Sequence, residues 1–159
     1  MPRGKKKIAK REICPDPVYN SELVHSLINV VMKCGKKNVA RKIVYDALGV
    51  LEKRFGSQEK ALEAFFKAYD QIVPLVEVRS RRVGGSVYQI PREVNPRRKR
   101  SLTFRWLLQA ARSRSNKTMG LRLGAELLEA YEGRGGAMKK RLDVHKMAEA
   151  NRAFSHYAW

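Results

Sequence analysis

Hydrophobic positions recur with two different periods along this chain of 159 residues. In six segments they recur every three to four residues, as on the buried face of an amphipathic helix. These segments cover about residues 21–33, 37–54, 57–73, 96–112, 115–131 and 138–154. Between residues 76 and 90 the period changes to two, which is typical of strands. The pattern predicts a mainly α protein, a six-helix bundle with one protruding β-hairpin.

Capping residues mark the ends of the predicted helices. Serine, threonine, asparagine and aspartate side chains accept hydrogen bonds from the first free N–H groups of a helix. Glycine favours the end of a helix because it adopts a left-handed conformation without strain, and Gly35 and Gly56 fit the ends of the first two. The side chains expected to begin helices are Asn20 or Ser21, Ser57, Asn95 and Ser115 or Asn116.

The predicted strands flank the tetrapeptide Val83-Gly84-Gly85-Ser86. Two consecutive glycines suit the positive φ angles of a tight hairpin turn. We expect the second strand to close at Pro91. A ribbon of two strands is marginally stable alone, so its base must pack on helices or on a partner. Along the strands, Val76 and Val78 alternate with Glu77 and Arg79, and Tyr88 and Ile90 alternate with Val87 and Gln89.

The helical spacing assigns most large hydrophobic side chains to buried faces. By this spacing Val39, Phe66 and Leu142 belong to the inward sides of the second, third and sixth helices. Gly120 and Gly124 lie one turn apart in the fifth helix, which permits the close approach of another helix. The sequence therefore predicts one packed helical core.

Composition excludes several classes of protein. Lys and Arg total 34 against 15 Asp and Glu, so the formal net charge is +19. With 43% hydrophobic residues the chain is not disordered throughout. Cys14 and Cys34 make no disulfide framework, and no apolar run is long enough to span a membrane. We expect a cytoplasmic single domain of residues 1–159, with a flexible basic arm at 1–19, the hairpin at 75–91, and a C-terminal helix and tail at 137–159.

Positive charge is concentrated around the hairpin. Residues 76–105 hold eight Arg and one Lys against two Glu, so 9 − 2 = +7. Arginine forks suit phosphate, and cations at a helix start oppose the helix dipole unless anions compensate them. A solvated surface is the plainer interpretation, and the charge density favours nucleic acid over it. The basic residues singled out are Arg79, Arg81, Arg82, Arg97, Arg98, Lys99 and Arg100. The arm adds Arg3, Lys5, Lys6, Lys7, Lys10 and Arg11, and Arg112, Arg114, Lys117, Arg122, Lys139, Lys140 and Arg141 widen the surface.

Aromatic side chains offer a second mode of nucleic-acid contact. Tyr88, Tyr157 and Trp159 could stack on bases, although Tyr88 fits a core position equally well. His25 and His145 have no Cys or carboxylate at metal-ligand spacing. We therefore expect no catalytic site, cofactor, metal or small-molecule substrate, and no membrane partner. A structural rRNA-binding protein, an architectural DNA-binding protein and an RNA-processing enzyme stay open as alternatives on these grounds alone.

Three segments resemble a known family, the bacterial small-subunit ribosomal protein seven. They read GGSVYQIPREVNPRRKRSLTFRWLLQAAR, KTMGLRLGAELLEAYEGRGGAMKKR and HKMAEANRAFSHYAW. The resemblance covers essentially the whole chain. It implies a primary rRNA-binding protein that binds the 3′ major domain of small-subunit rRNA, nucleates assembly of the subunit head, and lies near the exit-site tRNA and the mRNA path. It also implies contacts with small-subunit proteins nine and eleven.

The resemblance also distributes roles among residues of this sequence. It implies rRNA contacts at residues 5–11, at Arg79, and at Arg92 together with residues 97–100. It places the tip, formed by Arg81, Arg82, Val83, Gly84, Gly85 and Ser86, on the side of the exit-site tRNA and mRNA. The last helix and tail, with Lys139, Lys140, Arg141, Tyr157 and Trp159, would lie toward the exit-site tRNA and protein eleven.

Overall fold

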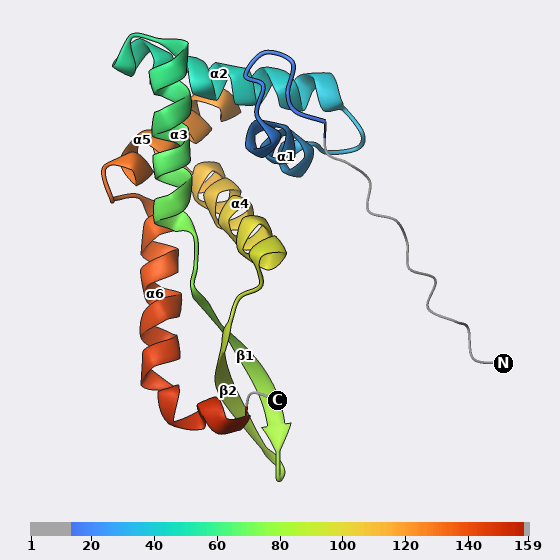
Figure 1. Cartoon of the computed structure of the whole chain (residues 1–159), viewed down its shortest axis with the longest axis vertical. Coiled ribbons are helices and arrows are strands. Elements are labelled where there is room, and N and C mark those ends of the chain that lie inside the picture. The colour runs from blue at the N-terminus through green and yellow to red at the C-terminus, as the bar shows by residue number, and fades with distance from the viewer. Residues whose placement is uncertain (1–13, 158–159) are drawn as a thin grey trace, which may run out of the picture.

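Six α-helices and one β-hairpin make up the part of the chain that the computed structural model describes, residues 14–157. Five helices gather into a body, and the hairpin projects from it beside the sixth (Figure 1). This confirms the predicted mainly α fold with a protruding hairpin. The elements are α1 (Glu22–Val31), α2 (Lys37–Phe55), α3 (Gln58–Ile72), β1 (Val76–Val83), β2 (Ser86–Glu93), α4 (Pro96–Ser113), α5 (Met119–Tyr131), α6 (Gly136–Ala150) and a 3-10 helix η1 (Arg152–Tyr157).

Capping residues explain several of the helix boundaries. The hydroxyl of Ser21 accepts from the N–H of Val24, and that of Ser57 from the N–H of Lys60. Gly56 ends α2 in the left-handed conformation, with φ of 81°. These three positions confirm two predicted helix starts and the predicted stop at Gly56.

Asn95 precedes α4 as predicted, although its side chain makes no capping hydrogen bond. Three predicted boundaries were wrong. The first helix ends at Val31, four residues before Gly35, which lies in the following turn with a positive φ. The fifth helix begins at Met119 under a Thr118 cap, because the residues after Ser113 first form an extended link. The last helix ends at Ala150 and tightens into η1, whereas the periodicity had predicted one helix to about residue 154.

The core of the body centres on α2, which contacts α1, α3 and α5. Phe65, Leu107 and Leu127 are among its fully buried side chains. A methyl group added at Gly124 would lie 2.8 Å from the Cβ atom of Val50 on α2. The pair Gly120 and Gly124 therefore permits the close approach of α5 to α2 that its spacing predicted.

Three hydrophobic side chains expected in the core are exposed instead. Val39 is 56% exposed, Leu142 47% and Phe66 38%. Helical spacing predicts which side of a helix is apolar, but not how much of that side the neighbouring helices cover.

The hairpin pairs Val83 with Ser86 across a two-residue turn of Gly84 and Gly85, both with positive φ. Pro91 does not close β2, which continues to Glu93, because Pro91 takes a place in the ladder opposite Val78. On β2 the alternation is as predicted, with Ile90 buried and Tyr88 half-buried. On β1 it is reversed, since Glu77 is the buried residue.

Residues 14–19 belong to the body rather than to a flexible arm. Asp16 is 1% exposed. Its carboxylate accepts from the backbone N–H groups of Val18 and Tyr19 and from the hydroxyl of Tyr45 on α2. Burial and this hydrogen bond raise the pKa of Tyr45. The arm predicted at 1–19 therefore extends too far, because Asp16, Val18 and Tyr19 at its end belong to the body.

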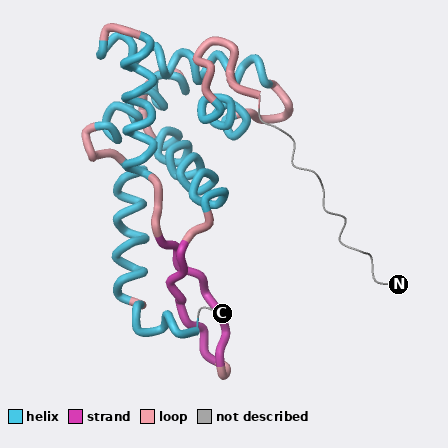
Figure 2. Tube along the Cα trace, in the orientation of Figure 1, coloured by secondary structure: helices cyan, strands magenta, loops and turns pink. Residues whose placement is uncertain are grey.

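The hairpin and α6 leave the body in the same direction (Figure 2). Beyond α6 the chain turns under the hairpin, where η1 contacts β2. Between residues 14 and 157 no helix is both long and apolar enough to cross a membrane.

Candidate nucleic-acid interface

The start of α4 carries four consecutive basic residues, Arg97, Arg98, Lys99 and Arg100, which we call the α4 cluster. No acidic residue lies in the first turn of this helix. Its first N–H groups lack a side-chain cap, so the positive end of the helix dipole and the cluster act together. This end of α4 can bind an anion such as phosphate.

A hollow of about 350 Å³ lies beside the cluster, between α4 and α1. Its walls include Arg97, Pro96, Arg100 and Ser26. A guanidinium N–H of Arg100 donates to the hydroxyl of Ser26 over 3.4 Å, which turns the side chain toward α1. Arg97 is exposed and makes no hydrogen bond or ion pair with the residues that the structure describes. The cluster therefore presents a mixed surface, with some arginines held and others available.

One carboxylate joins the α4 cluster to the base of the hairpin. Glu77 on β1 is 7% exposed and pairs with Arg79 at 2.6 Å and with Arg98 at 3.1 Å. Burial alone would raise the pKa of Glu77, but hydrogen bonds from Arg98 and Arg79 outweigh it and lower the pKa. The two basic segments that the sequence singled out separately thus form one surface around a buried negative charge.

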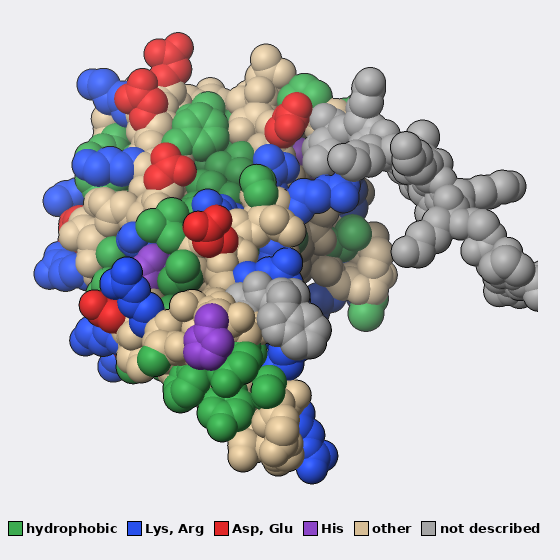
Figure 3. Space-filling model, turned by 60° about the horizontal axis from the view of Figure 1, so that its bottom comes forward, with side chains coloured by type: hydrophobic (Ala, Val, Ile, Leu, Met, Phe, Trp, Pro, Cys, Tyr) green, Lys and Arg blue, Asp and Glu red, His purple; other side chains and the backbone are tan. Residues whose placement is uncertain are grey.

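Basic side chains also line the outer part of the hairpin. Arg81 and Arg82 are exposed in β1, opposite Tyr88 and Val87 of β2. A guanidinium N–H of Arg81 donates to the carbonyl oxygen of Tyr157 in η1. In Figure 3 Lys and Arg side chains lie at the far end of the hairpin, and a group of hydrophobic side chains lies farther back along it. The outer hairpin therefore carries both charged and apolar surface.

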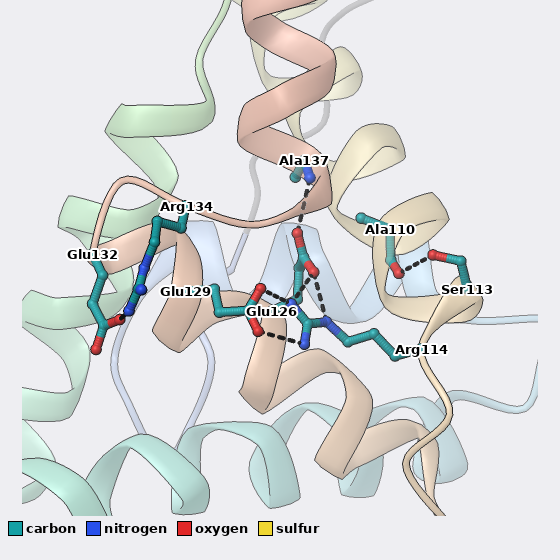
Figure 4. A network of polar contacts seen from close by, with 8 residues as sticks. All are labelled: Ala110, Ser113, Arg114, Glu126, Glu129, Glu132, Arg134 and Ala137. Atoms are coloured by element: carbon teal, nitrogen blue, oxygen red, sulfur yellow. Dashed lines mark hydrogen bonds and ion pairs between the residues drawn. The ribbon is translucent and has the colours of Figure 1, made fainter.

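Arg114 occupies an internal site. Its Nε–H donates to Glu126 over 2.6 Å, and its Nη1–H donates to Glu129 over 2.8 Å (Figure 4). The hydrogen bond from Arg114 lowers the pKa of Glu129. The hydrogen bonds to Glu129 and Glu126 together outweigh burial and raise the pKa of Arg114. Glu126 is 1% exposed, and its second oxygen accepts from the N–H of Ala137 at the start of α6. This guanidinium is engaged within the protein.

Sequence reasoning missed the Glu126 network. The arginine and its glutamate lie on different elements, the end of α4 and α5, and no local spacing connects them. The only signal was a glutamate among the apolar residues of α5, since a carboxylate is seldom buried without a partner. That signal indicates a partner without naming it.

The other predicted basic residues have diverse positions. Arg112 and Lys117 are exposed near the connection between α4 and α5, and Lys139 and Lys140 are exposed on α6. Arg141 donates to the backbone oxygen of Gln71 over 2.6 Å, so it joins α6 to the end of α3. Seven of the predicted contact residues lie outside the described residues: Arg3, Lys5, Lys6, Lys7, Lys10, Arg11 and Trp159.

Among residues 14–157 no three His, Cys, Asp or Glu side chains gather where they could hold a metal ion. Cys14 and Cys34 are both exposed and free.

Comparison with known proteins identifies the family of the chain. Residues 2–152 match the family described as ribosomal protein S7p/S5e. The chain belongs to this family. Among its relatives is the small ribosomal subunit protein uS7 of Sulfurihydrogenibium sp., 56% identical over the full length of both chains. The proteins of the same name from Azotobacter vinelandii and Clostridium beijerinckii are 56% and 53% identical, over 99% and 100% of each chain. The resemblance that the sequence suggested is thereby confirmed.

Proposed function

We propose that this protein is a structural rRNA-binding component of the small ribosomal subunit. Its family consists of ribosomal proteins rather than enzymes, which removes the RNA-processing alternative. The observation that carries the proposal is the joined basic surface of the α4 cluster and the hairpin base around Glu77. Arginines there are held at fixed spacing by a carboxylate and by Ser26, so they can meet phosphates of a folded RNA without first becoming ordered.

The finer assignment follows the resemblance and the geometry together. The α4 cluster and Arg92 would anchor the 3′ major domain of small-subunit rRNA and so nucleate assembly of the subunit head. The tip at residues 81–86 would meet the exit-site tRNA and the mRNA path. The tip is the part of the hairpin farthest from the body, so one element can reach two RNAs (Figure 1). Proteins nine and eleven would be neighbours, with protein eleven toward residues 139–159.

Salt-dependent binding to a fragment of the 3′ major domain tests the anchoring role. Replacing Arg97 and Lys99 together by Ala should weaken binding and reduce the slope of log affinity against log salt. Because the double variant can no longer neutralise about two phosphates, the slope should fall by roughly 1.5. Arg98 is left in place because its removal would also leave Glu77 with one partner fewer.

Lys53→Ala with Arg54→Ala is the matched control, because it removes two positive charges from the last turn of α2, a helix that does not contact α4. The control should bind like the unchanged protein. An equal loss in both double variants would mean that net charge alone drives binding, which contradicts an anchoring site on α4. Competition with a DNA duplex of equal length separates the architectural DNA-binding alternative, which requires equal affinities.

A further inference from the structure

The outer half of the hairpin has little support from the helical body. Residues 79–82 of β1 are all exposed, and so are most of residues 84–89. Two strands without further support are marginally stable in water. A hairpin that must present a tip in one direction therefore needs another contact near its outer end.

The end of the chain supplies that contact. In η1 the ring of Phe154 lies 5.1 Å from the ring of Tyr88 on β2, measured between centroids. The ring of Tyr157 lies 5.9 Å from Tyr88 and 3.9 Å from His156. The two pairs that include Tyr88 lie at separations where aromatic rings attract each other beyond the gain from burial. A hydrogen bond from Arg81 on β1 to the carbonyl oxygen of Tyr157 connects η1 to the first strand as well.

The lengths of the elements bring this contact to the right place. α6 has 15 residues and is about 22 Å long. Each strand has eight residues and spans about 26 Å. The chain therefore leaves α6 near the outer end of the hairpin. There Asn151 donates to the carbonyl oxygen of Met147 over 2.7 Å and closes the helix, and η1 crosses to β2.

We propose that residues 152–157 form a clasp that holds the outer hairpin in one direction, with Tyr88 and Phe154 as its positioning residues. α6 is a strut, the hairpin lies beside it, and the clasp closes the open end. Arg81 and Arg82 then have a fixed position relative to the α4 cluster. The consequence for RNA rests on the proposed function: the clasp sets the angle at which the tip meets its RNA. The clasp itself is a property of the free protein.

Amide hydrogen exchange of the free protein tests the clasp. Phe154→Ala should speed exchange of the ladder amides nearest the contact, those of the paired residues Arg81 and Tyr88, by about twofold to tenfold. Amides of α2 and α5 should keep their rates. Because Phe154 lies outside both strands, its effect on their amides must pass through the contact with Tyr88. The double variant with Tyr88→Ala should fall well short of the product of the two single effects.

Val87→Ala is the matched control, since Val87 neighbours Tyr88 on β2 but its side chain is 67% exposed. It should leave exchange within about twofold of the unchanged protein. Phe154→Leu keeps bulk without the ring and should lie between the unchanged protein and Phe154→Ala. Unchanged hairpin exchange in Phe154→Ala, or multiplicative effects in the double variant, would overturn the clasp. Since no RNA is present, neither result depends on which RNA the protein binds.

Discussion

Two glutamates are buried in the part of the protein that the structure describes, one in the helical body and one at the base of the hairpin. Glu126 is 1% exposed, and the side chain of its partner Arg114 is only 19% exposed. Glu77 is 7% exposed, but the side chains of its partners Arg79 and Arg98 are 56% and 42% exposed. The same pairing of glutamate with arginine thus occurs once shielded from solvent and once with partners largely exposed to it.

The difference separates structural arginines from those available to a partner. In the body, Arg114 has two carboxylates and Glu126 also accepts from the backbone of α6, so both groups are committed. At the hairpin, Arg79 and Arg98 share a single carboxylate and keep N–H groups in solvent. A phosphate can bind those groups without breaking the pair with Glu77. Counting arginines in the sequence does not distinguish the two situations.

Glu126→Ala should cause the largest loss of stability. The change leaves Arg114 with one carboxylate fewer and leaves the N–H of Ala137 without its acceptor. Removing one partner of a buried ion pair costs about 3 kcal/mol, because the other charge stays desolvated. Chemical denaturation measures the loss as a lower midpoint.

Glu132→Ala is the control for that measurement, since the pair of Glu132 with Arg134 is on the surface. Because solvent screens an exposed pair, this change should move the denaturation midpoint little. If the two variants lost equal stability, the distinction between buried and solvent-exposed ion pairs would be wrong.

Gly124→Ala should come next, at about 1–3 kcal/mol, through overpacking of the contact between α5 and α2. The new methyl would lie 2.8 Å from the Cβ of Val50 and 3.1 Å from the backbone oxygen of Ala47, and backbone yields little. Gly49→Ala is a matched control in α2, because no atom lies within 4 Å of the position where its methyl would be. There the better helix propensity of alanine should raise the thermal midpoint. If both substitutions changed the stability in the same direction, the close approach of α5 to α2 would be contradicted.

Much of the body could be predicted from sequence because its elements depend on local signals. Ser57 and Gly56 define the gap between α2 and α3 through hydrogen bonds within a few residues. The two-residue turn at Gly84 needs only its own positive φ angles. Helical spacing found the glycines that let α5 approach α2. These features follow from chain chemistry over one or two turns.

The remaining features depend on contacts between distant residues. Glu77 is buried on β1 because Arg98, 21 residues later, neutralises it. Asp16 is held by Tyr45, 29 residues later. The clasp depends on Tyr88 in β2 and Phe154 in η1, which lie far apart in the sequence. At the candidate site, sequence found the basic segments but could not tell that Arg114 is internal and Arg97 exposed.

Glu77→Gln should have a smaller effect, about 1 kcal/mol near neutral pH, because solvent screens its half-exposed partners. The folded protein lowers the pKa of Glu77 below the ordinary 4.5. The stability it contributes is therefore present above about pH 4.5 and is lost as the pH falls through the lower, folded pKa. The difference in unfolding free energy between the variant and the unchanged protein should shrink across that window. A difference independent of pH would mean that packing, and not charge, holds the hairpin to α4.

The smallest effect is expected at His145, where α6 meets the start of the hairpin. Its Nε2 accepts from the N–H of Leu75 over 3.2 Å, which requires a neutral ring. Burial and the nearby Arg141 lower the pKa of His145 below 6.5. Folding thus favours the neutral form, so the folded state loses stability as the pH falls below about 6.5, by about 1 kcal/mol or less.

Unfolding measured between about pH 7.5 and pH 5.5 should show this loss of stability. His145→Gln, whose amide oxygen can accept the same hydrogen bond, should lack it. His156→Gln, on an exposed position of η1, should keep the loss. If His145→Gln kept it as well, the junction between body and hairpin would not depend on the protonation of His145, and its stability would rest on packing as in the body.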